Sequence, residues 1–269
     1  MRHGVFVPPF GELAVPATTV ELAVAAEAAG WDGFFLWDHM WRPPDKPAEI
    51  ADAWIMLAAI ASATRRLRLG PMVTPLARRR PHKVAREALT LDHLSAGRLT
   101  LGVGLGVDTG GELERFGEET NEVVRAEMLD EALEVVLGLW RGEELDHHGR
   151  HYTAAGVRFL PRPLQQPRIP LWAAARGRSG AGPVRRAARL DGLFPVDTTS
   201  EQLSRMLDLV VADRGSLDRF DVAVRVFPGG DRSMLDVPGV TWAMWSFDEG
   251  EPAAAILDAV RSGPSALGR

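Results

Sequence analysis

Residues 66–106 read RLRLGPMVTPLARRRPHKVAREALTLDHLSAGRLTLGVGLG, and this stretch decides the fold. It begins with an apolar run at 66–73, which predicts a strand. Pro81 suits the first turn of a helix, and Val84, Ala88 and Leu91 then recur on one face until Gly97. A second apolar run follows at 98–106. Continuous apolar runs, as opposed to alternating ones, are typical of parallel strands that are covered on both faces.

The same unit of strand, turn and helix repeats along the chain. Thr18, with Glu21 three residues later, predicts the start of a helix that stops at Gly30. Asp52 and Asn121 predict two further helix starts. The other predicted strands lie at 3–7, 33–37, 170–175, 192–196, 220–227 and 240–245. Eight strands in a chain of this length favour a (β/α)₈ barrel of the TIM type over a doubly wound sheet.

We expect one domain over residues 1–269, because no linker or low-complexity segment interrupts the pattern. The segment 142–169 is an insertion after the fourth unit, and its sequence predicts a small hairpin followed by a Pro-rich extended stretch. The connection 228–239 is too short for a crossover helix, so the seventh unit is degenerate.

Composition excludes several classes of protein. The chain has 269 residues, 46% of them apolar, and no cysteine, which excludes disulfides, thiolate zinc sites and cysteine nucleophiles. The net charge is −5, which does not favour nucleic acid as a partner. No window approaches about 18 uncharged apolar residues, so no membrane span is expected. At the start of the chain the apolar run before the prolines covers only Val5 to Val7, which is too short for the core of a signal peptide. We therefore expect no membrane contact and a cytoplasmic location.

The carboxyl ends of the barrel strands are where function is expected. Trp37-Asp38-His39-Met40-Trp41 follows the second strand. An imidazole beside a carboxylate could act as a general acid or base, and the indoles could wall a flat ring. On spacing alone the alternative stays open that Asp38 caps a loop and the tryptophans pack the barrel rim.

Two further stretches offer weaker signals. Gly102–Gly106 is a poor nucleotide fingerprint, and close backbone packing explains it as well. Ala174-Ala175-Arg176-Gly177-Arg178 fits a phosphate site before a helix, and solvated arginines are an equal alternative. Arg78-Arg79-Arg80 is expected to be a solvated loop. The seven histidines lack the spacing of metal ligands, so no metal site is expected.

Three stretches together resemble the bacterial-luciferase-like flavin-dependent oxidoreductases: GWDGFFLWDHMW, the run quoted above, and FLPRPLQQPRIPLWAAARG. The resemblance extends from about residue 3 to residue 197. It implies a TIM-type barrel that binds reduced FMN or an 8-hydroxy-5-deazaflavin coenzyme at its mouth. The ring would lie against Met72, Val73 and Thr74, with a non-prolyl cis peptide near Met72–Val73.

The resemblance also implies roles for single residues. His39 would donate a proton beside the ring, with Asp38 next to it, and the backbone of Ala174, Ala175, Arg176 and Gly177 would hold the cofactor phosphate. Gly104 is assigned to the cofactor site. The substrate pocket is assigned to Phe10, Trp37, Trp41 and Trp245.

The chain departs from the family pattern at several places. Sugar-phosphate dehydrogenases that use the deazaflavin have a glutamate after the fourth strand, where this chain has Val107 and then Asp108. This disfavours a sugar-phosphate substrate. Past residue 197 the chain is shorter than usual, and lysines that hold phosphate in some members have no counterpart.

We therefore expect an oxidoreductase of the luciferase-like monooxygenase type that acts on a small organic molecule. It would use reduced FMN and oxygen, with a separate flavin reductase as partner, or transfer a hydride with the deazaflavin coenzyme. The alternatives are a non-catalytic flavin-binding barrel and, disfavoured by the lack of paired strand-end carboxylates, a cofactor-free hydrolase.

A homodimer through the helices 52–63 and 82–95 is also expected. The first of these helices carries apolar residues on more than one face, and a helix that covers a barrel needs only one apolar stripe. These residues are Trp54, Ile55, Met56, Leu57 and Ile60.

Overall fold

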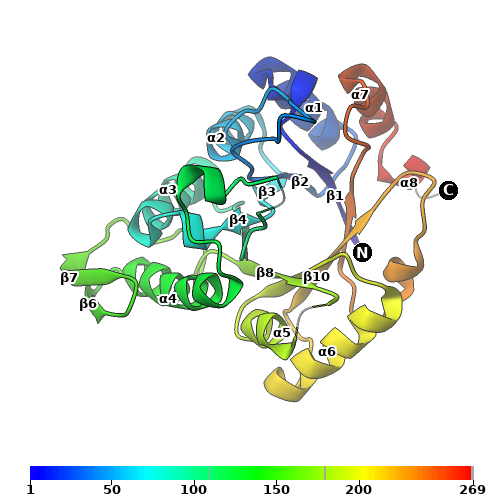
Figure 1. The fold of residues 1–269 in the computed structure, drawn as a ribbon. Coiled ribbons are helices and arrows are strands. Elements are labelled where there is room, and N and C mark those ends of the chain that lie inside the picture. The colour runs from blue at the N-terminus through cyan, green and yellow to red at the C-terminus, as the bar shows by residue number, and fades with distance from the viewer. Residues whose placement is uncertain (109, 179, 268–269) are drawn as a thin grey trace.

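The computed structural model describes residues 1–108, 110–178 and 180–267. Its main sheet has nine strands, in the order β3-β2-β1-β11-β10-β9-β8-β5-β4, and every neighbouring pair is parallel (Figure 1). The two end strands, β3 (Arg68–Pro71) and β4 (Thr74–Pro75), follow each other in the chain and share one barrel position. A bridge between Leu69 and Leu99 joins β3 to the segment that leads into β5 (Leu101–Gly104), so the sheet closes. The predicted TIM-type barrel is confirmed.

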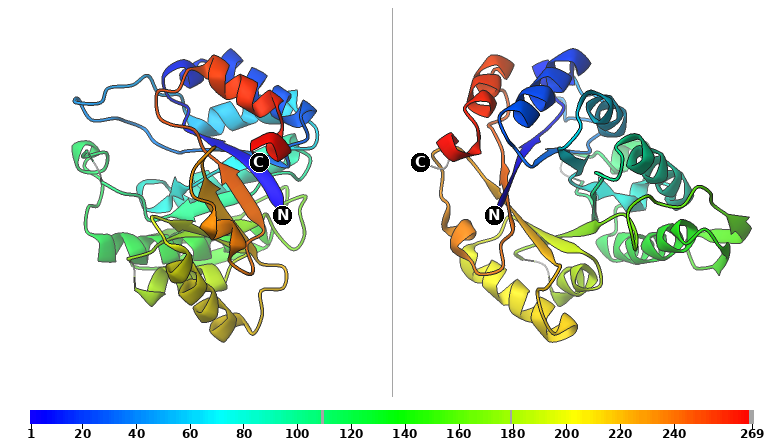
Figure 2. Two further views of the ribbon diagram at one scale, coloured as in Figure 1. Left: turned by 90° about the vertical axis from the view of Figure 1, so that its right-hand side faces the viewer. Right: turned by 180° about the vertical axis from the view of Figure 1, so that it is seen from behind.

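Helices form a ring outside the barrel (Figures 1 and 2). The remaining barrel strands are β1 (Arg2–Val7), β2 (Gly33–Leu36), β8 (Leu171–Arg176), β9 (Gly192–Val196), β10 (Asp221–Val226) and β11 (Trp242–Trp245). The helices are α1 (Pro16–Ala28), α2 (Ala53–Ala63), α3 (Pro81–Leu94), α4 (Glu122–Trp140), α5 (Ala181–Ala188), α6 (Ser200–Arg214), α7 (Ala253–Arg261) and α8 (Pro264–Leu267).

Both predicted irregularities of the barrel are present. The insertion forms an antiparallel hairpin of β6 (Glu144–His148) and β7 (Thr153–Arg158), which projects beyond α4 (Figure 2). Between β10 and β11 there is only a short 3-10 helix, Ser233–Asp236. In the described part of the chain, no helix is both long enough and apolar enough to cross a bilayer.

Local signals set most helix starts. The Asp52 side chain accepts a hydrogen bond from the backbone N–H of Ile55 at 2.8 Å and caps α2, and Asn121 caps α4 in the same way. The predicted capping box at Thr18 is wrong. The first helix begins two residues earlier at Pro16, whose ring fixes the backbone for a first turn, so Thr18 lies inside it.

Aromatic rings fill the amino end of the barrel. Phe35, Trp172 and Trp242 lie with their ring centroids 5.6–5.7 Å apart. Glycines on the same wall make room for them, because a Cβ atom on Gly33 would lie 2.6 Å from the Phe35 ring, and one on Gly192 would lie 2.5 Å from the Trp172 ring. Because these rings fill the amino end of the barrel, a ligand site is expected at the carboxyl end of the strands.

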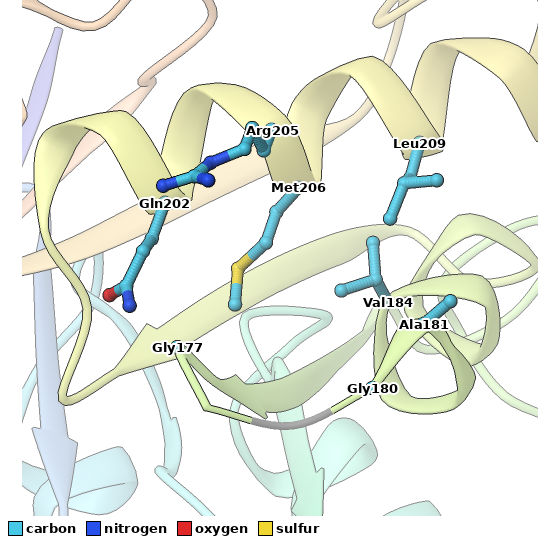
Figure 3. Close-up of a pocket in the computed structure, with 8 residues that line it drawn as sticks. All are labelled: Gly177, Gly180, Ala181, Val184, Gln202, Arg205, Met206 and Leu209. Carbon is cyan, nitrogen blue, oxygen red and sulfur yellow. The ribbon is translucent and has the colours of Figure 1, made fainter.

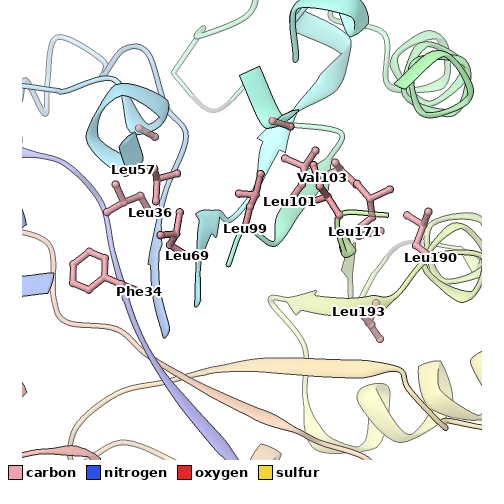
Figure 4. Packing of buried hydrophobic residues seen from close by; sticks show 14 of the residues in the cluster. Phe34, Leu36, Leu57, Leu69, Leu99, Leu101, Val103, Leu171, Leu190 and Leu193 are labelled. Atoms are coloured by element: carbon pink, nitrogen blue, oxygen red, sulfur yellow. The ribbon is translucent and has the colours of Figure 1, made fainter. Parts of the chain in front are cut away.

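An aliphatic layer separates the strands from the helices (Figure 4). In α2, the side chains of Trp54, Met56, Leu57 and Ile60 are all buried within this single chain, and only Ile55 is well exposed, at 74%. Of the five residues that suggested a second apolar face, four are therefore covered within the chain, and Ile55 alone remains for a contact with another copy. The helix packs against β3 and between α1 and α3, and these three neighbours cover its wide apolar stripe.

Candidate active site

The segment after β2 carries the first part of the site. The Asp38 carboxylate is buried and accepts hydrogen bonds at both oxygens. One oxygen accepts from Arg79 at 2.9 Å and from Arg78 at 3.2 Å. The other accepts from the Thr74 hydroxyl at 2.8 Å and from the Trp54 indole at 3.2 Å. With its oxygens engaged, Asp38 fixes the position of its segment and is not available as a base.

A second buried carboxylate, Glu112, holds His39. Its Oε2 accepts a hydrogen bond from His39 Nδ1 at 2.8 Å. Its Oε1 accepts from Arg78 at 2.6 Å and from the backbone N–H of Met40 at 2.5 Å. Because an ionised carboxylate can only accept, the proton lies on Nδ1. In the described part of the chain, His39 Nε2 has no hydrogen-bond partner and is the nitrogen left to act on a ligand.

The charge of Glu112 persists at any working pH. Burial alone would raise the pKa of Glu112. The hydrogen bond from His39, the charges of His39 and Arg78 and the bond from Met40 outweigh burial and lower this pKa to about 2. Two guanidinium groups, Arg78 and Arg79, balance the two carboxylates.

One expectation from the sequence is wrong here, and one residue of the site was not predicted. Arg78 and Arg79 were expected to be solvated, but their side chains are only 3% and 18% exposed and lie between the carboxylates. Only Arg80 of that run is exposed. The sequence offers Val107 and Asp108 after the fourth strand, and Glu112, which lies further along the same segment, was not predicted. The available signal was that an active histidine is commonly oriented by a second polar group.

Aromatic and small residues surround His39. The Trp37 ring lies 6.0 Å from that of His39, 5.7 Å from Phe6 and 6.1 Å from Phe10, centroid to centroid. Phe10 is in turn 5.9 Å from His39. The structure thus brings Phe10, Trp37 and His39 together, as the sequence analysis grouped them.

The segment between β3 and β4 lines the same end of the barrel. The peptide Met72–Val73 is cis, in line with the expectation. Met72 and Val73 both pack with the interior cluster, and a Cβ atom on Gly104 would lie 2.6 Å from Val73 Cγ2. Unlike Met72 and Val73, Thr74 is bound to a polar group, because its hydroxyl donates a hydrogen bond to the Asp38 carboxylate.

Two assigned pocket residues lie apart from this group. Trp245 is fully buried in the layer between strands and helices, and its indole donates to His3 Nδ1 at 3.2 Å. It is therefore not brought together with Trp37. Trp41 is half-buried, with the guanidinium of Arg115 5.0 Å from its ring centroid.

The assigned phosphate segment borders a cavity of about 260 Å³ between the ends of β8, α5 and α6 (Figure 3). Gly177 forms one wall, and a Cβ atom there would lie 2.4 Å from Gln202 Oε1. The residue before α5 is Gly180, which has no side chain with which to cap the helix. The other lining residues are Ala181, Val184, Arg205, Met206 and Leu209.

The rest of that segment divides between the two sides of β8. Ala174 packs with the barrel interior, and Ala175 packs in the outer layer. Arg176 is exposed, and its guanidinium lies 3.7 Å from the Asp197 carboxylate. Glycine backbone, the start of a helix and arginines suit a phosphate group, so these residues fit the anionic end of a cofactor. Among the described residues, no group of three or more metal-ligating side chains is present.

Comparison with known proteins gives a consistent family. Residues 1–233 match the family model described as luciferase-like monooxygenase. The F420-dependent glucose-6-phosphate dehydrogenase of Mycobacterium avium (strain 104) is 35% identical over 198 residues, which cover 70% of this chain and 55% of that protein. The chain spans about half the length of the curated relatives it matches.

Two solved structures share the fold. Monooxygenase RslO1 from Streptomyces bottropensis is 19% identical with a TM-score of 0.81, and the match covers 97% of each chain. The oxygenating constituent of 3,6-diketocamphane monooxygenase from Pseudomonas putida, solved in complex with FMN, is 18% identical with a TM-score of 0.68. That match covers 83% of this chain and 66% of the other. At these identities the likeness concerns the fold alone.

Proposed function

The chain belongs to the luciferase-like monooxygenase family, and from that premise we propose that it is an oxidoreductase that uses the deazaflavin coenzyme F420, with His39 as the proton-transferring residue. The observation that carries the proposal is the pair of His39 and buried Glu112, 2.8 Å apart at the carboxyl end of the barrel. The F420-dependent relatives favour the same cofactor.

Glu112 prepares His39 for proton transfer. By accepting from Nδ1 it fixes the tautomer, so that Nε2 can take a proton and later return it. Because Glu112 stays ionised, it also stabilises the positive charge that His39 gains on taking a proton. Asp38, held by Arg78 and Arg79, keeps the segment in place.

The remaining residues of the site would bind the cofactor. Deazaflavin coenzymes supply a site that accepts or gives a hydride. Trp37, Phe10 and Val73 offer apolar surface for a flat ring, and Gly104 leaves room beside Val73. The segment 174–177 and the start of α5 would hold the phosphate. A substrate hydroxyl would give its proton to His39 Nε2 as its carbon gives a hydride to the cofactor. In the reverse direction a carbonyl oxygen would accept that proton from His39 Nε2.

The first experiment is a parallel titration of the purified protein with F420 and with FMN, followed by fluorescence or calorimetry. We expect binding of F420 in preference to FMN. Preference for FMN would overturn the deazaflavin assignment and point to the oxygen-using chemistry of the family, with a separate flavin reductase as partner.

The second experiment tests His39 by substitution. With F420 bound and a panel of small alcohols and ketones, turnover is read from the absorbance of the cofactor. His39→Ala should lower kcat by roughly 10²–10⁴-fold, as loss of a general acid does, and leave F420 affinity nearly unchanged. Unaltered turnover in this variant would remove His39 from the mechanism. A wild-type protein that binds F420 tightly and turns over no substrate would support the non-catalytic alternative.

A further inference from the structure

Arg225 lies at the carboxyl end of β10 and is held there as a fixed cation. Along β10 the side chain of Ala223 points into the barrel interior, and Arg225, two residues on, points to the same side one step nearer the mouth. Its guanidinium carbon lies 4.9 Å from the ring centroid of Trp37 and 4.5 Å from that of Phe227. These two rings hold the plane of the guanidinium group.

A chain of hydrogen bonds fixes the same side chain. Arg225 Nε donates to the Ser246 hydroxyl at 3.1 Å, and that hydroxyl donates to the backbone oxygen of Phe6 at 3.1 Å. The bond uses Nε only. In the part of the chain that the structure describes, neither terminal nitrogen of Arg225 has a hydrogen-bond partner. Arg225 is exposed, so the fork of this positioned guanidinium group is open to a ligand from solvent.

The carboxylates near Arg225 are engaged elsewhere. Glu249 pairs with Arg42, and Asp197 lies 3.7 Å from the guanidinium of Arg176. Asp248 is exposed to solvent. Burial lowers the pKa of Arg225, and these three carboxylates offset that effect only in part. No carboxylate of the described residues lies within 4 Å of its guanidinium group.

The indole ring over which Arg225 lies carries a second donor without an acceptor. The indole nitrogen of Trp37 is buried and has no acceptor among the described residues. Trp37 also touches the ring of His39, with a centroid separation of 6.0 Å. A cationic fork and an indole N–H, both without acceptors, suit a ligand that brings acceptor oxygens and negative charge.

We propose that the substrate carries an anionic group, a carboxylate or a phosphate, which binds the guanidinium fork of Arg225 next to Trp37. This inference rests on the proposed function, because it takes the barrel mouth around His39 as the substrate site. The fork geometry favours an anion with two oxygens in one plane, which can accept both terminal N–H groups. The anion would hold the substrate at the mouth and leave its reacting carbon to the cofactor and His39.

The test uses small aromatic probes that differ in charge. Benzoate and phenyl phosphate are anionic, benzamide is the neutral counterpart of benzoate, and all three carry a ring that suits the aromatic mouth. Binding to the F420-loaded protein is measured by calorimetry and by the fluorescence of the tryptophans. We expect at least one anion to bind about tenfold more tightly than benzamide or better. Equal affinity of the wild-type protein for all three probes would by itself overturn the proposal.

Variants then locate the anion. Arg225→Met should abolish the preference for the anion, and Arg225→Lys should restore it in part, because lysine keeps the charge and loses the planar fork. Arg66→Met is the matched control, since Arg66 is exposed before β3, at the opposite end of the barrel, and the change removes the same charge. An unchanged preference in Arg225→Met, or an equal loss in Arg66→Met, would overturn the assignment.

The same variants separate this inference from the proposed function. F420 affinity is measured on wild type and Arg225→Met in parallel. An unchanged F420 affinity, together with loss of anion binding, supports a substrate anion. Weaker F420 binding in Arg225→Met would overturn the proposal, because the arginine would then hold the cofactor phosphate. Failure of wild type to bind F420 would refute the proposed function, and the comparison of benzoate with benzamide on that protein would still decide whether Arg225 binds anions.

Discussion

At the scale of single residues, the candidate site depends on a carboxylate that the surroundings keep ionised. The pKa of Glu112 lies near 2, below the ordinary value of 4.5 for a glutamate. A carboxyl group whose pKa is lowered by folding stabilises the native state above its unfolded pKa, and this contribution is lost as pH falls toward the folded pKa. The window of change is therefore between pH 4.5 and pH 2.

We expect Glu112→Gln to lower the free energy of unfolding by about 3 kcal/mol at pH 7, from the size of that pKa difference. The loss relative to wild type should shrink as the pH is taken below 4.5. Urea unfolding at pH 7, 4 and 3 measures both effects. Glu114→Gln is the matched control, because Glu114 is exposed and should show no such loss. A penalty that does not change with pH would mean that the charge of Glu112 is not what stabilises the network.

A second prediction at this scale concerns Arg176. Its contact with Asp197 is an exposed ion pair, and such pairs contribute about 0–1 kcal/mol to stability. Arg176→Ala should therefore leave unfolding nearly unchanged and weaken cofactor binding by about 1.5–3 kcal/mol, if the guanidinium group binds the phosphate. Arg185→Ala, which removes a comparable exposed pair with Asp213, should change neither. Equal weakening toward a cofactor analogue without phosphate would make Arg176 a structural residue.

At the scale of elements, buried side chains outside the site join the barrel to its insertion. Asp92 on α3 is fully buried, and its carboxylate accepts hydrogen bonds from the backbone N–H of Leu164 at 2.8 Å and from the Gln165 side chain at 2.9 Å. Arg68 donates to the same Gln165 side chain at 2.8 Å. The Pro-rich stretch after the hairpin is thus tied to the third helix and the third strand.

We expect Asp92→Ala to destabilise the protein by about 3 kcal/mol, because it removes a buried carboxylate that accepts hydrogen bonds from three partly buried N–H groups of Leu164 and Gln165. Hydrogen exchange should accelerate first in residues 160–169. Asp146→Ala is the control, since Asp146 accepts a single exposed bond from Gly156 and its loss should stay below about 1 kcal/mol. A loss of similar size in both variants would show that Asp92 does not act as an anchor.

Sequence patterns predicted the elements better than the contacts between them. The eight barrel strands, the hairpin and the short seventh connection follow from runs of apolar residues and from turn residues, which are local signals. The pairing of Arg78 with Glu112, 34 residues away, and of His39 with Glu112, 73 residues away, leaves no local pattern. A run of three arginines before a proline therefore suggested a solvated loop, and only the closed barrel brings two of them onto buried carboxylates.

At the scale of the whole molecule, the carboxyl end of the barrel carries a few charged side chains around aromatic rings. Arg78 and Arg79 neutralise Asp38 and Glu112, Arg42 pairs with Glu249, and Arg225 lies over Trp37 with its fork unused. Side chains that are already paired hold the site rigid, and those that are not define what it can bind. An anionic substrate and a phosphorylated cofactor would use different arginines, Arg225 on β10 and Arg176 on β8, which are separated by β9.

Association of two copies is the last prediction at this scale. We expect a homodimer through α2 and α3, and the surface to test is now narrower than the sequence suggested. Met56 and Ile60 are buried within one chain, so changing them would unfold the protein and report nothing about association. Ile55 is 74% exposed, and the neighbouring Ala58 and Ala59 are partly exposed, so a close approach of two helices can bury this face.

Sedimentation equilibrium at micromolar concentration should give twice the chain mass of 29.3 kDa. Ile55→Arg should return the mass to that of one chain, because the arginine places a charge in the middle of the contact and leaves the core of the barrel untouched. Val123→Arg is the matched control, since Val123 is a similarly exposed apolar residue at the start of α4, outside both helices, and should not change the mass. A mass near 29.3 kDa for the wild-type chain would refute the dimer, and a dimer that survives Ile55→Arg would refute this surface. Thermal melting of the variant distinguishes the two causes of a lower mass, because a variant that melts like wild type has lost its partner and not its fold.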